Sequence, residues 1–319
     1  MKCVVTGGSG FIGSHLVDHL LDAGWQVKVL DLRRPIQNVE WTELDIRHDL
    51  GRSLAGVDLV FHLAALANAR KCGEYPDLCI ATNVGGTLNV LRAAHEFGVA
   101  RVVLASSCWV AGAQVGDVVD EDSPFALAAV NTVYGASKIA QEMLCFSCHG
   151  EYGGPAYTIL RYGIPYGERM WKGLVVREFM YQSETNHRIS IMGDGKQHRE
   201  FLYVGDLCEA QVLAAAPVAV NKTYNLTGPV PVTVEELAKE VVKLLPASID
   251  YVPQARIEPK LRHVNNSLAR RELGWEPRTT LTDGIERCVS WWKSLSKEAK
   301  EEEYWCRGGP EGQSRGAAR

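Results

Sequence analysis

A tyrosine and a lysine four positions apart, Tyr134 and Lys138, are the residues best suited to acid–base chemistry. The segment around them predicts a helix over Thr132–Tyr152, and residues four apart share one face of a helix. A lysine ammonium beside a tyrosine stabilises the phenolate and lowers the pKa of the phenol, which would make Tyr134 a general base near neutral pH. The hydroxyl of Ser106 or Ser107, at the end of a predicted strand, could bridge Tyr134 and a substrate alcohol. Capping of a helix or turn is the alternative role for these serines.

A glycine-rich loop, TGGSGFIG at positions 6–13, is the second feature that could do chemistry. Its residues 8–13 fit the pattern G-x-G-x-x-G, and Gly7, Gly10 and Gly13 fit the variant G-x-x-G-x-x-G. The loop stands between a predicted strand, Cys3–Thr6, and a predicted helix, Phe11–Ala23. In that setting, glycines permit a tight turn and let backbone N–H groups at the helix N-terminus approach a pyrophosphate. The loop therefore predicts a dinucleotide site, with a purely structural glycine turn as the alternative.

The carboxylate of Asp31, at the end of the next predicted strand, Gln26–Leu30, indicates which dinucleotide binds. It can accept hydrogen bonds from the adenosine ribose hydroxyls and would repel a 2′-phosphate. Arg33 and Arg34 follow closely and are of the type that binds a 2′-phosphate. The carboxylate nevertheless favours NAD over NADP as the cofactor.

Composition excludes several other classes of protein. The net charge is −4, so a broad basic surface for nucleic acid or an anionic membrane is not expected. No apolar run reaches the length of a membrane span, and the first residues do not form a signal peptide. The nine cysteines show no framework spacing, and Cys145 and Cys148 lack the second pair that a zinc site would need. We therefore expect reduced thiols, a cytoplasmic protein and no metal.

Short β-branched segments alternate with longer helical patterns through the first half of the chain, which predicts an α/β fold with a parallel sheet covered on both faces. Further strands are predicted at Asp58–Leu63, Arg101–Ala105 and Tyr157–Arg161, and further helices at Pro76–Phe97, Val204–Ala216, Thr233–Leu245 and Thr282–Lys293. From Lys297 onward the chain is charged, glycine-rich and aperiodic, so we expect a frayed helix end followed by disorder.

Several motifs in order make the chain resemble the extended short-chain dehydrogenase/reductase superfamily, and within it the NAD-dependent nucleotide-sugar epimerases and dehydratases. The motifs are TGGSGFIG (6–13), DIR (45–47), HLAA (62–65), NVGGT (83–87), ASS (105–107), YGASK (134–138), RYGIPYG (161–167), GDGKQHREFLYVGD (193–206) and LGW (273–275). Together they are far more specific than any one of them alone.

The resemblance implies roles for named residues. The residues implied to bind NAD are Gly7, Gly10, Phe11, Ile12, Gly13, Asp31, Asp45, Ile46, Ala64, Ala65, Asn83, Tyr134 and Lys138. The implied catalytic residues are Ser107, Tyr134 and Lys138. The residues implied to contact a nucleotide sugar are Ser107, Cys108, Ile164, Arg199 and Arg256. For Arg199, a solvated surface charge is the alternative.

The resemblance also implies an organisation into domains. Residues 1–162 and about 201–228 would form a doubly wound Rossmann domain that binds NAD. Residues about 163–200 and 229–295 would form a smaller, mostly helical substrate domain, with 296–319 as a disordered tail. Relatives commonly dimerise through two helices, one of which carries the tyrosine and lysine found here at Tyr134 and Lys138. The apolar residues of that helix, such as Ile139 and Met143, would suit a homodimer or the chain's own core.

The implied first step is oxidation at C4 of the sugar, after which epimerases, dehydratases and decarboxylases diverge. The 4,6-dehydratases usually carry an Asp-Glu pair after the catalytic hydroxyl residue, where this chain has Cys108 and Trp109. This favours 4-epimerisation, with dehydration (using the thiol as an acid) or decarboxylation as alternatives. Ile164 and Ala111 depart from the usual asparagine and tyrosine near the substrate, so the identity of the sugar stays open. A reductase on a non-nucleotide substrate and a non-catalytic NAD-binding protein are further alternatives.

Overall fold

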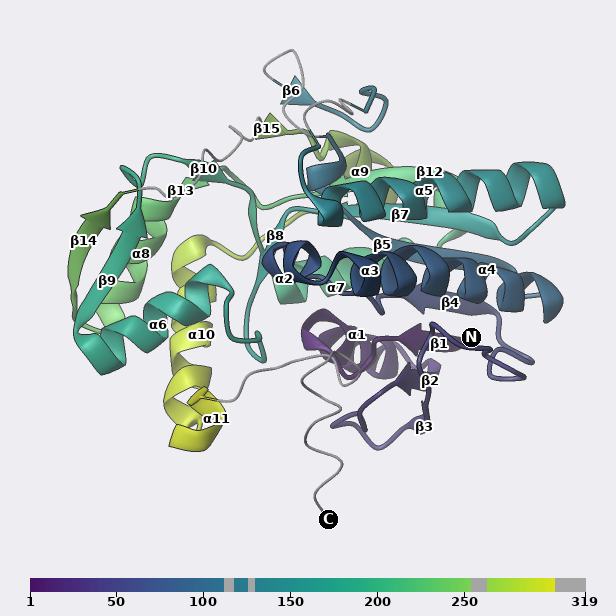
Figure 1. Ribbon diagram of the computed structural model, residues 1–319, viewed down its shortest axis with the longest axis horizontal. Helices are drawn as coiled ribbons and strands as arrows, with labels where there is room; N and C mark the ends of the chain where they lie inside the picture. The colour runs from purple at the N-terminus through teal and green to yellow at the C-terminus, as the bar shows by residue number, and fades with distance from the viewer. Residues whose placement is uncertain (112–117, 126–129, 254–262, 302–319) are drawn as a thin grey trace.

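A sheet of seven parallel strands carries helices on both of its faces (Figure 1). The computed structural model describes residues 1–111, 118–125, 130–253 and 263–301. The strands lie in the order β12-β7-β5-β4-β1-β2-β3. Their bounds are β1 Lys2–Thr6, β2 Gln26–Asp31, β3 Glu40–Glu43, β4 Leu59–His62, β5 Arg101–Ser107, β7 Ala156–Tyr162 and β12 Lys222–Leu226. The predicted Rossmann-type fold is confirmed.

Alternating side chains of the strands feed two separate cores. On β1, Cys3 and Val5 belong to the core shared with α1 (Phe11–Asp22) and α7 (Val204–Leu213). Val4, between them, belongs to the core under α4 (Gly86–Glu96) and α5 (Val133–Tyr152). Because both faces of the sheet are buried, its strands are apolar runs, as expected for a parallel sheet.

The strand order reverses between the parallel strands β1 and β4, because the chain continues from β1 to β2 on one side and from β4 to β5 on the other. In open α/β sheets, ligands bind in the crevice at this reversal, beyond the carboxyl ends of the strands. The glycine loop follows β1, HLAA begins at the end of β4, and Ser107 ends β5. The topology therefore gathers these motifs at one edge of the sheet.

The segment predicted as one helix, Pro76–Phe97, is interrupted. It consists of α3 (Pro76–Cys79), a π-helical turn (Ile80–Gly85) and α4, and it is preceded by α2 (Ala69–Glu74), which the sequence did not predict. The π turn contains Asn83, whose side chain hydrogen bonds with the backbone of Leu66. Since π turns occur mostly at functional positions, the interruption points to the site.

A smaller group of elements, to the left in Figure 1, packs beside the carboxyl edge of the sheet. It includes α6 (Val175–Asn186), α8 (Val234–Leu244), α10 (Leu281–Ser294) and the parallel pair β9 (Arg188–Met192) and β14 (Ser248–Val252). Thr233 and Glu236 form a capping box at the start of α8, which fixes this predicted helix. The remaining described strands and helix are β6 Val118–Val119, β8 Ile164–Tyr166, β10 His198–Arg199, β11 Phe201–Tyr203, β13 Val232–Thr233, β15 His263–Val264 and α9 Ser267–Leu273.

Lys297–Glu301, where a frayed helix end is expected, form the short helix α11. The Arg177 guanidinium donates to the carbonyls of Ala299 and Lys300, at 2.9 and 3.2 Å. The Lys300 ammonium also lies 2.7 Å from a Glu184 carboxylate oxygen. These contacts hold the segment against α6, and residues 302–319 lie outside the described part of the chain.

A buried ion pair joins α5 to β7. The Arg161 guanidinium and the Glu142 carboxylate are 2.8 Å apart, and their side chains are 6% and 0% exposed. Ser106 of β5 donates to the same carboxylate at 2.5 Å. Glu142 therefore connects the helix that carries Tyr134 to two neighbouring strands.

We predict that Arg161→Met lowers the free energy of unfolding by about 3–5 kcal/mol, because it leaves the Glu142 carboxylate buried without its charge partner. The matched control is Arg188→Met, which removes an exposed ion pair with Asp250 and should cost less than about 1 kcal/mol. Urea unfolding of the two variants measures the difference. Equal losses would show that the buried pair does not stabilise the fold.

Candidate active site

The glycine loop brings two segments of backbone into contact. Gly7 has a φ of 73°, and a Cβ at this residue would lie 2.7 Å from the backbone nitrogen of Ala64, just beyond β4. A Cβ at Gly13 would lie 2.1 Å from the carbonyl oxygen of Gly7. α1 begins at Phe11 after Gly10, and no side chain caps it. Its first N–H groups are therefore available to a phosphate at the positive end of the helix dipole.

The Asp31 carboxylate closes the other end of this loop. Its two oxygens accept hydrogen bonds from the backbone N–H groups of Ser9 and Arg33, each at 3.0 Å. The Arg33 guanidinium donates to the carbonyl of Ser9 at 3.1 Å. Burial raises the pKa of Asp31, and these N–H groups and the Arg33 charge oppose that effect. Each carboxylate oxygen keeps a lone pair that a ribose hydroxyl could use.

The other residues expected at the cofactor follow β3 and β4. Hydrogen bonds from Arg47 hold the Asp45 carboxylate; although burial acts to raise its pKa, Arg47 brings it below the usual value. Ile46 is buried, and a Cβ on Gly86 would lie 2.5 Å from its Cδ1 atom. Ala64 and Ala65 follow β4 beside Gly7 and are partly exposed. These residues lie along the carboxyl edge of the sheet, between Asp31 at the end of β2 and Ser107 at the end of β5.

The three expected catalytic residues meet at the ends of β5 and α5. Tyr134, at the start of α5, is hydrogen bonded with the side chain of Ser107. Lys138 lies one turn further along, with its Nζ atom 5.9 Å from the Tyr134 ring centroid. The Lys138 ammonium donates to the carbonyl of Ala105 at 2.8 Å and is almost fully buried. One backbone carbonyl therefore fixes the position of the charge beside the tyrosine.

Burial raises the pKa of Tyr134 well above its usual value, while the hydrogen bond with Ser107 lowers it. Burial lowers the pKa of Lys138 to about 8. The lysine therefore keeps its charge at neutral pH. A further positive charge near Tyr134 would be needed to bring its phenol into the range of a general base.

The two serines of β5 have different roles because successive residues of a strand point to opposite faces. The side chain of Ser106 points to Glu142, whereas that of Ser107 meets Tyr134. The Ser107 Oγ atom also accepts a hydrogen bond from the N–H of Trp109, at 3.3 Å. Of the pair that the sequence left open, the structure brings Ser107 to the tyrosine.

Asn83 contributes to the site from beneath it. Its side chain is fully buried and bonds with the N–H and the carbonyl of Leu66, at 2.7 and 3.1 Å, and with Ser137 Oγ, at 2.9 Å. Ser137 in turn donates to the carbonyl of Tyr134 at 2.8 Å. Every polar atom of the Asn83 side chain is therefore buried and has a partner within the chain, and its contact with NAD stays a prediction. Asn83 joins the segment after β4 to α5.

A buried imidazole that the sequence analysis did not assign to a role lies at the end of β4. His62 Nδ1 is 2.7 Å from Thr6 Oγ1, and Nε2 is 2.8 Å from Thr87 Oγ1. The Thr87 hydroxyl donates to the carbonyl of Asn83, so it accepts from His62, which assigns the proton to Nε2. Burial and the Lys138 charge lower the pKa of His62 to about 3. The HLAA motif marked this residue, but only the folded chain shows its partners.

The residues expected at the substrate are close to Ser107 where the structure describes them. Cys108 is buried, and burial raises the pKa of its thiol to about 12. Arg199 is only 8% exposed, so the alternative of a solvated charge is wrong, and its charge acts on the Cys108 thiol. Ile164 begins β8, and its N–H donates to the carbonyl of Glu200 at 2.7 Å. Arg256 lies outside the described residues.

Comparison with known proteins also points to a dinucleotide-binding enzyme. The sequence profile of the NAD dependent epimerase/dehydratase family matches residues 3–227. The chain belongs to this family. The glycine cradle, which a single Cβ would fill, and the uncapped start of α1 fit the pyrophosphate of NAD. When bound, NAD accepts a hydride from the substrate and can return it. The family assignment confirms the predicted cofactor and the prediction of an enzyme.

The relatives carry out different reactions. The chain is 35% identical over 91% of its length to UDP-glucuronic acid decarboxylase 1 of Arabidopsis thaliana, of which it covers 69%. It is 32% identical over 92% of its length to a putative UDP-glucose 4-epimerase of Methanocaldococcus jannaschii, of which it covers 99%. The solved UDP-glucuronic acid 4-epimerase of Bacillus cereus, with UDP-glucuronic acid and NAD, superimposes with a TM-score of 0.85. It is 26% identical, and the match covers 93% of this chain and all of the other.

Within the part of the chain that the structure describes, no helix is both long enough and apolar enough to cross a membrane.

We predict that Gly13→Ala weakens NAD binding by about 10- to 100-fold, because the displaced loop loses a hydrogen bond to a charged phosphate, which is worth about 1.5–3 kcal/mol. The control is Gly150→Ala in α5, where a Cβ meets no atom within 4 Å. Titration of cofactor-free protein with NAD measures both affinities, and circular dichroism checks the fold. Wild-type affinity in a folded Gly13→Ala variant would contradict the proposed phosphate site.

We predict that His62 makes the protein sensitive to acid. Its pKa is lower in the folded state than in the unfolded state, so the unfolded chain binds more protons and stability falls as pH drops below about 6.5. Between pH 6.5 and 5.0 this amounts to about 2 kcal/mol. Urea unfolding at both pH values should show a loss in the wild type that exceeds the loss in His62→Gln by about this amount, because the variant keeps His15, whose pKa burial also lowers. Equal losses in both proteins would count against a neutral buried imidazole.

Proposed function

We propose that this protein is a nucleoside-diphosphate-sugar 4-epimerase that uses NAD and works through a transient 4-keto sugar. The observation that carries the proposal is the convergence of Ser107, Tyr134 and Lys138 at the cofactor edge of the sheet. The sugar's C4 hydroxyl would take the place next to Tyr134 and Ser107. Tyr134 would accept the hydroxyl proton and later return it, while Ser107 holds the oxygen in position.

Two positive charges act on Tyr134 in this proposal, those of Lys138 and of oxidised NAD. The Lys138 ammonium, fixed by the carbonyl of Ala105, stabilises the Tyr134 phenolate. The positive charge of oxidised NAD would act in the same direction, against the burial that raises the pKa of Tyr134. The base would then be active only when oxidised cofactor is present. This suits a reaction in which the cofactor is regenerated within each turnover.

The residues after Ser107 support epimerisation over dehydration. Loss of water from C5 and C6 needs an acid and a base, and Cys108 and Trp109 stand where dehydratases carry them. With a pKa of about 12 and almost no exposure, the Cys108 thiol is a poor proton donor or acceptor at neutral pH. It is better suited to packing beside the sugar.

Arg199 is the residue of choice for the substrate's diphosphate. A guanidinium buried to this extent needs anionic or carbonyl partners, and it already donates to the carbonyl of His198 at 2.9 Å. We assign Arg256 to the same task on the resemblance alone. The partner would be a nucleotide sugar, as in the Bacillus cereus complex.

Decarboxylation is the second candidate, since the plant decarboxylase is 35% identical to this chain. A 4-keto uronic acid is a β-keto acid and loses carbon dioxide without a dedicated carboxylate base. The two reactions therefore share the residues that oxidise C4 and, with a uronic acid substrate, differ in whether the keto sugar loses its carboxyl group before hydride returns.

We further propose a homodimer in the cytoplasm. On α5, Met143 is 47% exposed, whereas Leu144 and Phe146 pack on the chain's own core, so Met143 is the residue of this face free to meet a partner. The eight cysteines of the described residues are all free thiols, which suits a reducing compartment. Light scattering of the purified protein measures the oligomeric state.

We predict that incubation with UDP-, GDP- and dTDP-sugars, without added NAD, gives a product of unchanged mass from one substrate. Chromatography with mass detection separates epimers from other products. A product lighter by carbon dioxide would replace the proposal with the decarboxylase, and one lighter by water with a dehydratase. Tyr134→Phe should lower kcat by at least about 100-fold, since it removes the general base. Full activity of this variant would contradict the assigned base.

A further inference from the structure

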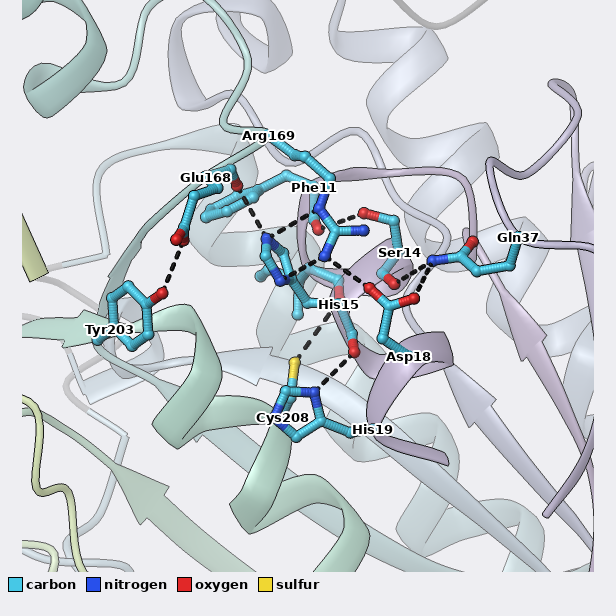
Figure 2. A network of polar contacts seen from close by, with 11 residues as sticks. Phe11, Ser14, His15, Asp18, His19, Gln37, Glu168, Arg169, Tyr203 and Cys208 are labelled. Carbon is cyan, nitrogen blue, oxygen red and sulfur yellow. Dashed lines mark hydrogen bonds and ion pairs between the residues drawn. The ribbon is translucent and has the colours of Figure 1, made fainter. Parts of the chain in front are cut away.

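A dipeptide in the loop after β8, Glu168-Arg169, contacts α1 on one side and β11 on the other (Figure 2). The two side chains of the dipeptide contact different elements. Arg169 contacts α1, the helix that begins at the glycine loop, and Glu168 contacts Tyr203, next to α10 of the smaller group. Neither residue belongs to the glycine loop or to the catalytic set.

The Arg169 guanidinium contacts residues in two successive turns of α1. Its Nη2 atom lies 2.6 Å from His15 Nδ1 and 2.7 Å from a carboxylate oxygen of Asp18. His15 and Asp18 are two and five residues beyond Gly13. A single guanidinium therefore fixes the helix within two turns of the expected pyrophosphate.

The His15 imidazole can accept a hydrogen bond from the Arg169 guanidinium because the ring is neutral. Burial, followed by the Arg169 charge, lowers its pKa to about 4. With the ring proton on Nε2, His15 donates to the carbonyl of Glu168 at 2.9 Å, and Nδ1 is free to accept from the guanidinium. The backbone and the side chain of the dipeptide thus hold the same ring.

Asp18 extends the network to the adenosine side. Its second oxygen accepts a hydrogen bond from Gln37 Nε2 at 2.8 Å, and the same Nε2 lies 2.6 Å from the carbonyl of Ser14. Gln37 belongs to the segment after Asp31. Through Asp18 and Gln37, Arg169 is connected to the backbone of Ser14 in α1 and to the segment that follows Asp31.

Glu168 anchors the dipeptide on the other side. Its carboxylate accepts from the Tyr203 hydroxyl at 2.7 Å, and the Arg287 guanidinium of α10 lies 5.2 Å from the Tyr203 ring centroid. Arg169 itself has a φ of 61°, a conformation that is costly for a residue with a side chain. Such a conformation persists where surrounding contacts determine it, and here they bind both ends of the dipeptide.

We propose that Arg169 is a positioning residue for the cofactor: by holding α1 at His15 and Asp18, it keeps the helix start in place and slows the release of NAD. Retention matters to this enzyme family in particular, because the hydride must return to the same sugar. If the reduced cofactor left during turnover, the keto sugar could not be reduced back.

The test measures the dissociation of radiolabelled NAD from preloaded full-length protein during a chase with unlabelled NAD. Arg169→Gln should speed release by about 3- to 30-fold, the range expected when a residue acts through a network. The matched control is Arg188→Gln, in an exposed ion pair with Asp250 far from α1, and its rate should stay within about twofold of wild type. A role in stability alone would lower the melting temperature and leave the release rate unchanged.

A second variant keeps the proposal testable if Arg169→Gln does not fold. Asp18→Asn weakens the same contact while leaving His15 in place, so it should speed release by a smaller factor. Where both single variants fold, the double variant should release NAD no faster than Arg169→Gln alone, because the two residues act together. Release at the wild-type rate in the folded variants, or multiplicative effects in the double variant, would overturn the proposal. Neither result depends on which sugar the enzyme uses.

Discussion

The close approach of two backbones, between the turn after β1 and the segment after β4, is the constraint on which the rest of the site depends. Gly7 and Gly13 leave no space for a Cβ, so the turn, the start of α1 and Ala64 form one compact unit. In this unit, the uncapped N–H groups at the start of α1 lie at the point where the strand order reverses, between β1 and β4. A phosphate site made of backbone is insensitive to rotamers, but it needs the helix axis held in place.

The catalytic helix is held by a different kind of contact. Beneath the site, hydroxyls and an imidazole connect β1, β4, the π turn and α5 through His62, Thr87 and Asn83. The side chains of His62, Thr87 and Asn83 each have donor or acceptor partners there, whereas Oε1 of Gln141, which donates to Thr87, has none. Burial keeps the imidazole neutral. Because such a network is costly to leave half-satisfied, it favours one arrangement of α5 against the sheet. The position of Tyr134 relative to the cofactor edge follows from it.

The sequence predicted the parts of the protein whose signals are local. The glycine loop and the alternation of strands and helices specify the Rossmann half, because turn geometry and hydrophobic periodicity are visible within short windows. Contacts between distant segments were not visible in this way. The break at Asn83 interrupts an otherwise periodic helix for the sake of Leu66, the burial of Arg199 depends on its neighbours in space, and α11 is stabilised by Arg177 from another helix. No sequence pattern near Arg169 predicted its contact with α1.

The opposite orientation of Ser106 and Ser107 restricts how this protein can change. A deletion or insertion of one residue within β5 would exchange the two hydroxyls, turning the one beside Tyr134 toward the Glu142–Arg161 pair. The chemistry and the core would fail together, since each needs its own serine in its own register. Evolution can therefore vary the side chains along this strand but not its length, and the lengths of the loops around the sugar remain the freer variable for acquiring a new substrate.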